Sequence, residues 1–376
     1  MSDAALWRGL EAAALTAAAV LVALLLFGGF VALGGLDPLE VYRVLYLGAF
    51  GTQFSIETTL TRAAPLMLTA LCVAIPARAG LLVIGGEGAL VIGGIATVLA
   101  AVGLAGMPAA LAVPLVLALG AAAGAGWIAT AAALRQYRGV NETISTLLFN
   151  YIAIALLNHL VSGPIRDFAV SLKPTSWAVN PAFLIGRIPG LSVHWGLAFG
   201  VIACVLAYAV LNWTTFGFGT RILGGNLRAA QMAGLPVARL ALVAAALGGG
   251  AAGLAGSLEV LAVHGAASTS LVVGYGYAGI LVAFVARQNP LAVIPVALLV
   301  GGISASGGLL QRRFDMPDAA TTVLEGTIFL VVLASNTLYG RFRFLQPRRS
   351  AQAPAAPRAE RSTAPASPPA PERRIA

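Results

Sequence analysis

The chain has 376 residues, of which 59% are hydrophobic and only 10% are charged, and its formal net charge at pH 7 is +9. Soluble domains average about 25% charged residues, so this chain has too few charges to build a water-facing surface. These values exclude a soluble enzyme or a nucleic-acid-binding domain. We therefore expect a multi-pass protein of the lipid bilayer.

The apolar stretches are continuous and lack the alternation with period two that marks a transmembrane barrel. Because a backbone in lipid must satisfy its own hydrogen bonds, these stretches are predicted to be helices. A span of the hydrocarbon core takes ~20 helical residues. We expect an all-α transmembrane helix bundle with about ten membrane segments, at residues 12–34, 60–78, 81–103, 109–134, 143–161, 194–213, 240–262, 275–287, 290–310 and 319–339.

The eighth segment is too short to span the membrane comfortably. It begins with Gly274-Tyr275-Gly276-Tyr277 and ends before Pro290, which indicates a broken or re-entrant element buried within the protein. A weak internal echo relates Gly80–Ala100 to Gly276–Gly302, each a glycine-punctuated apolar stretch. Such pseudo-repeats are frequent in transporters, whose sites lie near the midplane at the repeat interface.

The polar segments divide the chain into a membrane domain, residues 1–345, and a tail, residues 346–376, predicted to be disordered, basic and cytoplasmic. Within the membrane domain, residues 162–193 form a long polar loop and residues 214–239 a basic, glycine-rich segment. The arginine bias predicts cytoplasmic termini, a cytoplasmic 214–239 segment and a periplasmic 162–193 loop. Arg312 and Arg313 fall on the outer side and break this pattern.

No enzymatic constellation is visible. The single lysine, Lys173, follows Leu172, so the chain lacks the Gly-Lys-Ser/Thr sequence of a phosphate-binding loop. His159, His194 and His264 are far apart, and no zinc-binding His pair occurs. We expect a non-catalytic protein without a cofactor or metal.

Ionisable groups in a membrane span are functional candidates. Glu87 lies in Gly85-Gly86-Glu87-Gly88, either beside a translocation path or as an acceptor of backbone hydrogen bonds at a helix break. Asn141 and Glu142 follow inner arginines and favour a helix cap over a place on the path.

Thr146 and Asn150 share one face of the next apolar helix. They line a path or bind neighbouring helices, with packing slightly favoured. Tyr275 and Tyr277 are candidates for stacking on a planar solute, although aromatic side chains are common at membrane interfaces. Glu259 receives no role from the sequence.

The segment 215–235 carries the pattern G-x-R-x-x-G-x-N-x-x-A-A-x-x-A-G. It resembles the cytoplasmic coupling segment of bacterial binding-protein-dependent ABC permeases, in the branch for simple sugars and nucleosides. The resemblance implies contact with an ATPase through Gly219, Arg221, Gly224, Gly225, Asn226, Ala229, Ala230, Ala233 and Gly234.

Three further segments resemble the same family, at residues 61–80, 139–150 and 274–291. The second of them is similar to the nucleoside branch in particular. One departure concerns the stretch 82–89, where Val83 and Ala89 replace an asparagine and a glutamine that are usual in that branch.

The residues themselves support a coupling role for a short helix at 226–233. Asn226 is predicted to cap it and Gly234 to close it. The small side chains of Ala229, Ala230 and Ala233 are expected to face a partner, and the preceding glycines to form tight turns.

The resemblance implies a permease subunit of an ABC importer in the bacterial inner membrane, moving nucleosides or simple sugars by alternating access. Implied partners are a cytoplasmic ATPase, a homologous second permease and a periplasmic or lipid-anchored solute-binding protein. The alternative is a secondary transporter driven by an ion gradient, for which Glu87 is the candidate ion-responsive acid.

Overall fold

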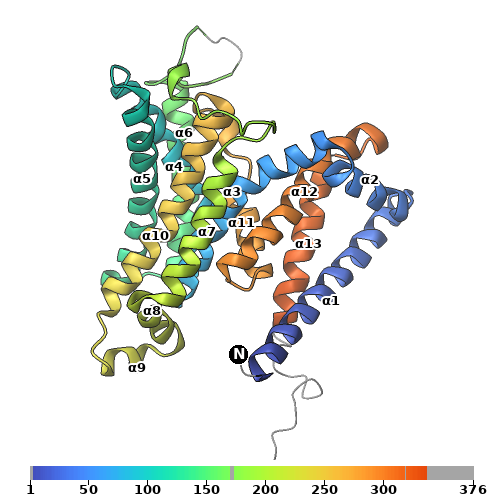
Figure 1. Cartoon of the computed structure of the whole chain (residues 1–376), viewed down its shortest axis with the longest axis horizontal. Coiled ribbons are helices and arrows are strands. Elements are labelled where there is room, and N and C mark those ends of the chain that lie inside the picture. The colour runs from blue at the N-terminus through green and yellow to red at the C-terminus, as the bar shows by residue number, and fades with distance from the viewer. Residues whose placement is uncertain (1–2, 170–172, 318, 337–376) are drawn as a thin grey trace, which may run out of the picture.

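Figure 1 shows the computed structural model, which describes residues 3–169, 173–317 and 319–336. The predicted tail, residues 346–376, lies outside the described residues. Isolated β-bridges but no strands occur in the described ranges. The α-helices are α1 (Asp3–Leu33), α2 (Pro38–Phe50), α3 (Gln53–Ala77), α4 (Gly86–Gly103), α5 (Ala109–Arg138), α6 (Glu142–Ser162), α7 (Gly196–Trp213), α8 (Thr215–Gly225), α9 (Leu227–Met232), α10 (Val237–Leu258), α11 (Tyr275–Val285), α12 (Pro290–Phe314) and α13 (Ala319–Asn336).

The expected membrane bundle is confirmed. Eight helices of the described chain are long and apolar enough to cross a membrane, and two shorter apolar stretches, Thr269–Val285 and Ala319–Ser335, bring the segments to about ten. The sequence missed α2, which is only 13 residues long and carries Glu40 and Arg43. Asp37 caps α2 by accepting a hydrogen bond from the Leu39 N–H at 2.9 Å.

The two ends of the bundle differ in what they carry. Figure 1 shows α8 and α9 at one end, together with the beginning of α1, and the long connection between α6 and α7 at the other. We call these the α9 end and the loop end. Arg312 and Arg313, which break the expected charge pattern, lie in the last turn of α12. Cations there suit the negative end of the helix dipole.

Helix α3 is the central element, because it packs against α7, α10, α11 and α12. Its window of membrane-spanning residues is 78% buried, the largest share among the candidate spans. Apolar side chains such as Leu66, Met67 and Leu71 are fully buried there. Helix α3 therefore forms much of the interior of the bundle.

The helices α3–α6 and α10–α13 form two equivalent units. Helix α10 packs on α4 and α5 as α3 packs on α11 and α12, and α4 contacts α6 as α11 contacts α13. The sequence echo between Gly80–Ala100 and Gly276–Gly302 agrees with this equivalence, since it covers α4 and α11. The units run in opposite directions, because α3 ends beside α8 whereas α10 leads to the loop end.

Candidate functional site

Helix α4 begins in the middle of the bundle, after a non-helical stretch at residues 81–85. Side chains of α6 satisfy the backbone of this stretch. The Leu82 N–H donates to Glu142 Oε1 at 3.2 Å, and the Ile84 N–H donates to Thr146 Oγ1 at 3.1 Å. Asn150 Nδ2 donates to the Ile84 carbonyl at 3.0 Å. Non-helical backbone at membrane depth needs such partners.

Asn150 also links the non-helical stretch at residues 81–85 to α4, because its Oδ1 accepts a hydrogen bond from the Gly88 N–H at 2.7 Å. Glu142 and Asn150 are eight residues apart with Thr146 midway, so one face of α6 supplies all three side chains. Glu142 pairs with Arg135, and Asn141 caps α6 by accepting from the N–H groups of residues 143 and 144. The contacts of these predicted path residues are those of packing and capping.

Glu87 joins the two units. Its side chain is fully buried, and its two carboxylate oxygens accept hydrogen bonds from the N–H groups of Gly274 at 2.9 Å and Gly276 at 2.6 Å. Gly274 is the N-cap residue of α11 and Gly276 lies in its first turn, and this helix likewise begins within the bundle. The N-termini of α4 and α11 therefore meet, and the carboxylate lies where two partial positive charges converge. We call this the half-helix junction.

Glycines make the half-helix junction possible. The Cα of Gly276 would lie 3.5 Å from a Cβ added at Gly86, and a Cβ added at Gly276 would overlap the Glu87 backbone nitrogen. Gly274 has φ +89°, a conformation that is cheap only for glycine. The two helix ends touch backbone to backbone at this point.

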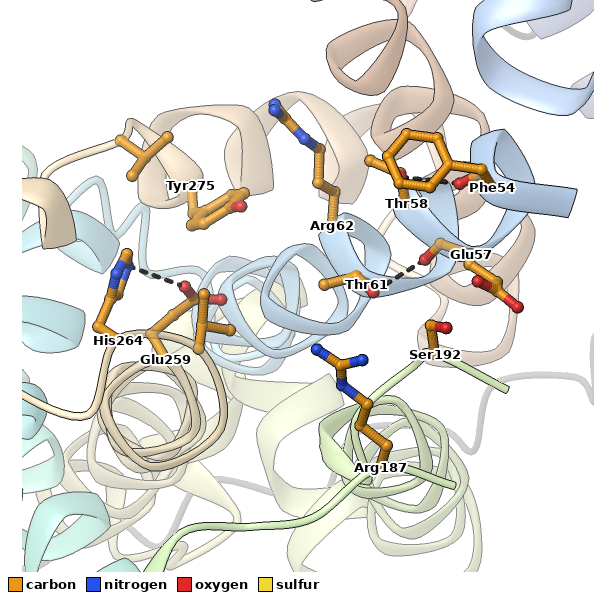
Figure 2. A pocket seen from close by; sticks show the side chains of 12 residues that line it. Phe54, Glu57, Thr58, Thr61, Arg62, Arg187, Ser192, Glu259, His264 and Tyr275 are labelled. Carbon is orange, nitrogen blue, oxygen red and sulfur yellow. Dashed lines mark hydrogen bonds and ion pairs between the residues drawn. The ribbon is translucent and has the colours of Figure 1, made fainter. Parts of the chain in front are cut away.

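A cavity of about 510 Å³ opens at the loop end between α3, the 187–192 segment, the end of α10 and the start of α11. Figure 2 shows charged side chains from the first three of these segments around it, and Tyr275 from the start of α11. We call it the outer cavity. Its lining residues are Phe54, Glu57, Thr58, Thr61, Arg62, Arg187, Ser192, Glu259, Val263, His264, Val273 and Tyr275.

Two smaller cavities continue along α11. The cavity of about 220 Å³ shares Arg62 and Tyr275 with the outer cavity. The cavity of about 370 Å³ in turn shares Tyr277 with the cavity of about 220 Å³. Tyr275 and Tyr277, predicted as stacking residues, thus lie on consecutive cavities. The sequence missed Arg62 and Arg187, because single arginines near a membrane surface carry no distinguishing pattern.

The short helix α9 forms as the sequence predicts. Asn226 caps it, with its Oδ1 accepting from the Ala229 N–H at 3.1 Å. Gly234 follows it with φ +70°, and the Leu235 N–H donates to the Ala230 carbonyl at 3.1 Å. These bonds satisfy groups that a helix end leaves free.

The expected outward face of α9 is partly wrong. Ala229 and Ala233 are exposed, but Ala230 is completely buried and packs with the apolar cluster that includes Leu235. The exposed apolar surface instead includes Met232, of which 89% is accessible. In this six-residue helix, Ala230 is the residue that faces the rest of the protein.

The expected turns at the preceding glycines are also wrong, because residues 215–225 form α8. Gly217 and Gly224 instead allow close packing. A Cβ at Gly217 would overlap the Leu211 carbonyl, and one at Gly224 would overlap the Arg78 carbonyl and lie 3.0 Å from the Gly80 nitrogen. Arg221 reaches back to α7, where its Nη2 donates to Asn212 Oδ1 at 3.3 Å.

Known proteins resemble this chain over most of its length. Residues 55–333 match the family described as branched-chain amino acid transport system, permease component. A glucose ABC transporter permease protein of Haloferax volcanii is 32% identical over 89% of this chain and 91% of its own length. A guanosine ABC transporter permease protein of Bacillus subtilis is 30% identical over 79% of this chain and 86% of its own.

A nucleoside ABC transporter permease protein of Lactococcus lactis is 26% identical over 80% of this chain and 85% of its own length. The family match spans most of the chain from α3 to α13, including the half-helix junction and α8–α9. The matches confirm the resemblance drawn from the coupling segment. The chain therefore belongs to the family of branched-chain amino acid transport system permease components, and it is a multi-pass membrane permease subunit of an ABC transporter.

Proposed function

We propose that the protein is the permease subunit of an ABC importer that carries nucleosides, with simple sugars as the second candidate class. The observation that carries this proposal is the series of cavities along α11, which begins at the loop end and passes Tyr275 and Tyr277. The printed functions of the relatives, guanosine, nucleoside and glucose transport, fit the same solute classes.

The charges of the outer cavity favour an uncharged polar solute. Two arginines, Arg62 and Arg187, are balanced by two carboxylates, Glu57 and Glu259. Hydroxyl groups and the aromatic rings of Phe54 and Tyr275 complete the lining. A nucleoside offers a planar base and a polyhydroxyl sugar, which match a pocket of apolar walls with a few polar groups.

In this proposal the α9 end faces the cytoplasm and the loop end faces the periplasm. Arginines such as Arg135, Arg138, Arg228 and Arg239 lie beside the helix ends and segments near α9, in keeping with the bias toward the cytoplasmic side. Both termini are then cytoplasmic, and the membrane is the bacterial inner membrane.

The partners follow from this orientation. A solute-binding protein docks at the loop end, and an ATPase binds α8 and α9. A second, homologous permease subunit completes the translocation unit. ATP binding closes the ATPase, displaces α9 and opens the path inward by alternating access.

An ion-gradient mechanism has less support. Its candidate acid, Glu87, accepts a backbone hydrogen bond on each of its carboxylate oxygens, so the contact between the two helix ends already accounts for its buried position. The relatives that align over most of this chain are named as permeases of ABC transporters.

The test is ATP-dependent uptake of radiolabelled guanosine and glucose by membrane vesicles that hold the complete transporter. Ala229→Arg adds a charge to the exposed side of α9 and is expected to abolish uptake while the protein still assembles. Ala105→Arg makes the same change on an exposed residue in the 104–108 turn and is the control, with uptake retained. Uptake that survives without ATP hydrolysis but collapses with the ion gradient would contradict the proposal.

A further inference from the structure

The carboxylate of Glu259 lacks hydrogen-bond donors. The residue is only 6% exposed. In the described part of the chain its one ionisable neighbour within 4 Å is His264, whose Nε2 lies 3.6 Å from Oε2, and no hydrogen bond to either oxygen occurs there. That separation exceeds a hydrogen bond. Burial of a carboxylate is costly unless donors surround it, so the site is incomplete as the chain alone builds it.

A local change of helix type directs Glu259 into the outer cavity. Residues Glu259–His264 form one π-helical turn at the end of α10, and the Gly265 N–H donates to the Val260 carbonyl at 2.8 Å, five residues back. Turns of this kind are rare and occur often at functional sites. Figure 2 shows Glu259 and His264 together at one end of the cavity, near Tyr275.

The same end of the cavity offers more than one kind of contact. The Tyr275 ring provides an apolar face, and Thr61 lies between this end and Glu57 at the other. Arg62 and Arg187 have no carboxylate within 4.0 Å among the described residues. A volume of about 510 Å³ is within the range of small-molecule pockets.

A pair of hydroxyl donors would complete the surroundings of the Glu259 carboxylate. A carboxylate accepts two hydrogen bonds side by side, and acidic residues bind ribose hydroxyls in this way in dinucleotide sites. We propose that the Glu259 carboxylate binds a vicinal diol of the transported solute, from the ribose of a nucleoside or the ring of a simple sugar, with Tyr275 against its apolar face. This assignment rests on the proposed function and names the group that the outer cavity recognises.

The experiment compares matched solutes in vesicles that hold the complete transporter. One pair is guanosine and 2′-deoxyguanosine, and the second is glucose and 2-deoxyglucose, so the pair that responds identifies the source of the diol. Glu259→Gln is expected to lower uptake of the hydroxylated member by about tenfold, the effect of one hydrogen bond to a charged group. Uptake of the deoxy member is expected to fall much less.

Three features keep the test decisive. The solute-binding protein is unchanged, so its own preference cancels when the variant is compared with the wild type. Glu40→Gln, the same change at an exposed position of α2, is the control and is expected to leave both ratios unchanged. His264→Asn, which removes the neighbour of the carboxylate, is expected to give a smaller loss with the same selectivity.

Equal losses for both members of each pair, or no loss at all, would overturn the diol assignment while leaving the importer intact. A wild-type transporter that takes up neither pair with ATP would overturn the proposed function and the assignment with it. If the Glu259→Gln protein fails to reach the membrane, His264→Asn is tested in its place. An equal loss of uptake for the hydroxylated and the deoxy solute in that variant overturns the assignment.

Discussion

Glu87 and Glu259 are both buried carboxylates, but they differ in the hydrogen bonds that they accept from the protein. At the half-helix junction, Glu87 accepts backbone hydrogen bonds at 2.9 and 2.6 Å on its two oxygens. In the outer cavity, Glu259 accepts none from the described residues, and its neighbour His264 is 3.6 Å away. Both positions would count as functional candidates by burial alone. The difference in hydrogen bonding separates a carboxylate that holds the fold from one that is available to a ligand.

The strongest way to break the half-helix junction is Gly276→Ala. The new Cβ would overlap the Glu87 backbone, so the two helix ends must separate, at a cost of about 3 kcal/mol, the upper part of the range for overpacking. A thiol-reactive dye follows unfolding in detergent, because Cys72 and Cys204 are both buried. The expected result is a clear drop in the unfolding temperature.

The control for this change is Gly126→Ala in α5, where nothing lies within 4 Å of an added Cβ. Alanine is the better helix former by about 1 kcal/mol, so the control protein is expected to unfold no earlier than the wild type. An unchanged Gly276→Ala protein would mean that the helix ends do not touch as described.

A second test sets the two carboxylates against each other. Glu87→Gln turns one acceptor into an amide donor that faces a backbone N–H, and is expected to lower the free energy of unfolding by about 2 kcal/mol. Glu259→Gln removes no hydrogen bond from the described protein and is expected to change stability by less than about 0.5 kcal/mol. The same dye assay measures both. Similar losses for the two variants would remove the distinction between them.

The smallest expected effect on stability concerns the hydrogen bonds by which α6 supports the non-helical stretch at residues 81–85. Thr146→Val keeps the shape but leaves the Ile84 N–H, bonded to Thr146 Oγ1 at 3.1 Å, without its acceptor, at a cost of about 1 kcal/mol. Thr130→Val is the control, since the Thr130 hydroxyl donates only to the Gly126 carbonyl of its own helix at 2.7 Å. If both variants unfold alike, α6 does not hold the 81–85 stretch.

Much of the fold was predictable because apolar runs report membrane helices directly. The cap of α9 was predictable as well, since Asn226 bonds a backbone group only three residues away. Local interactions of this kind leave a signal in consecutive residues. The inward side of Ala230 was not predictable, because a helix of six residues is too short to show a periodicity.

The candidate site was harder to predict for a related reason. The outer cavity takes Glu57, Arg187, Glu259 and Tyr275 from four separate segments, and nothing in the sequence says that these segments meet. Glu87 was the stronger candidate before the structure was known, because its flanking glycines can be seen in the sequence whereas a carboxylate without donors cannot. Which of two buried acids has donors is a property of the three-dimensional packing.

The contact at Gly224 has a mechanical consequence. No side chain separates α8 from the end of α3, since a Cβ at Gly224 would overlap the Arg78 carbonyl and crowd the Gly80 nitrogen. Side chains can change rotamer and absorb a displacement, whereas two backbones in direct contact cannot. A push on α9 therefore passes through α8 to residue 80 with little slack, and the next residues, 81–85, are the stretch that α6 holds in place. A displacement of α9 would thus reach the non-helical stretch from which α4 begins.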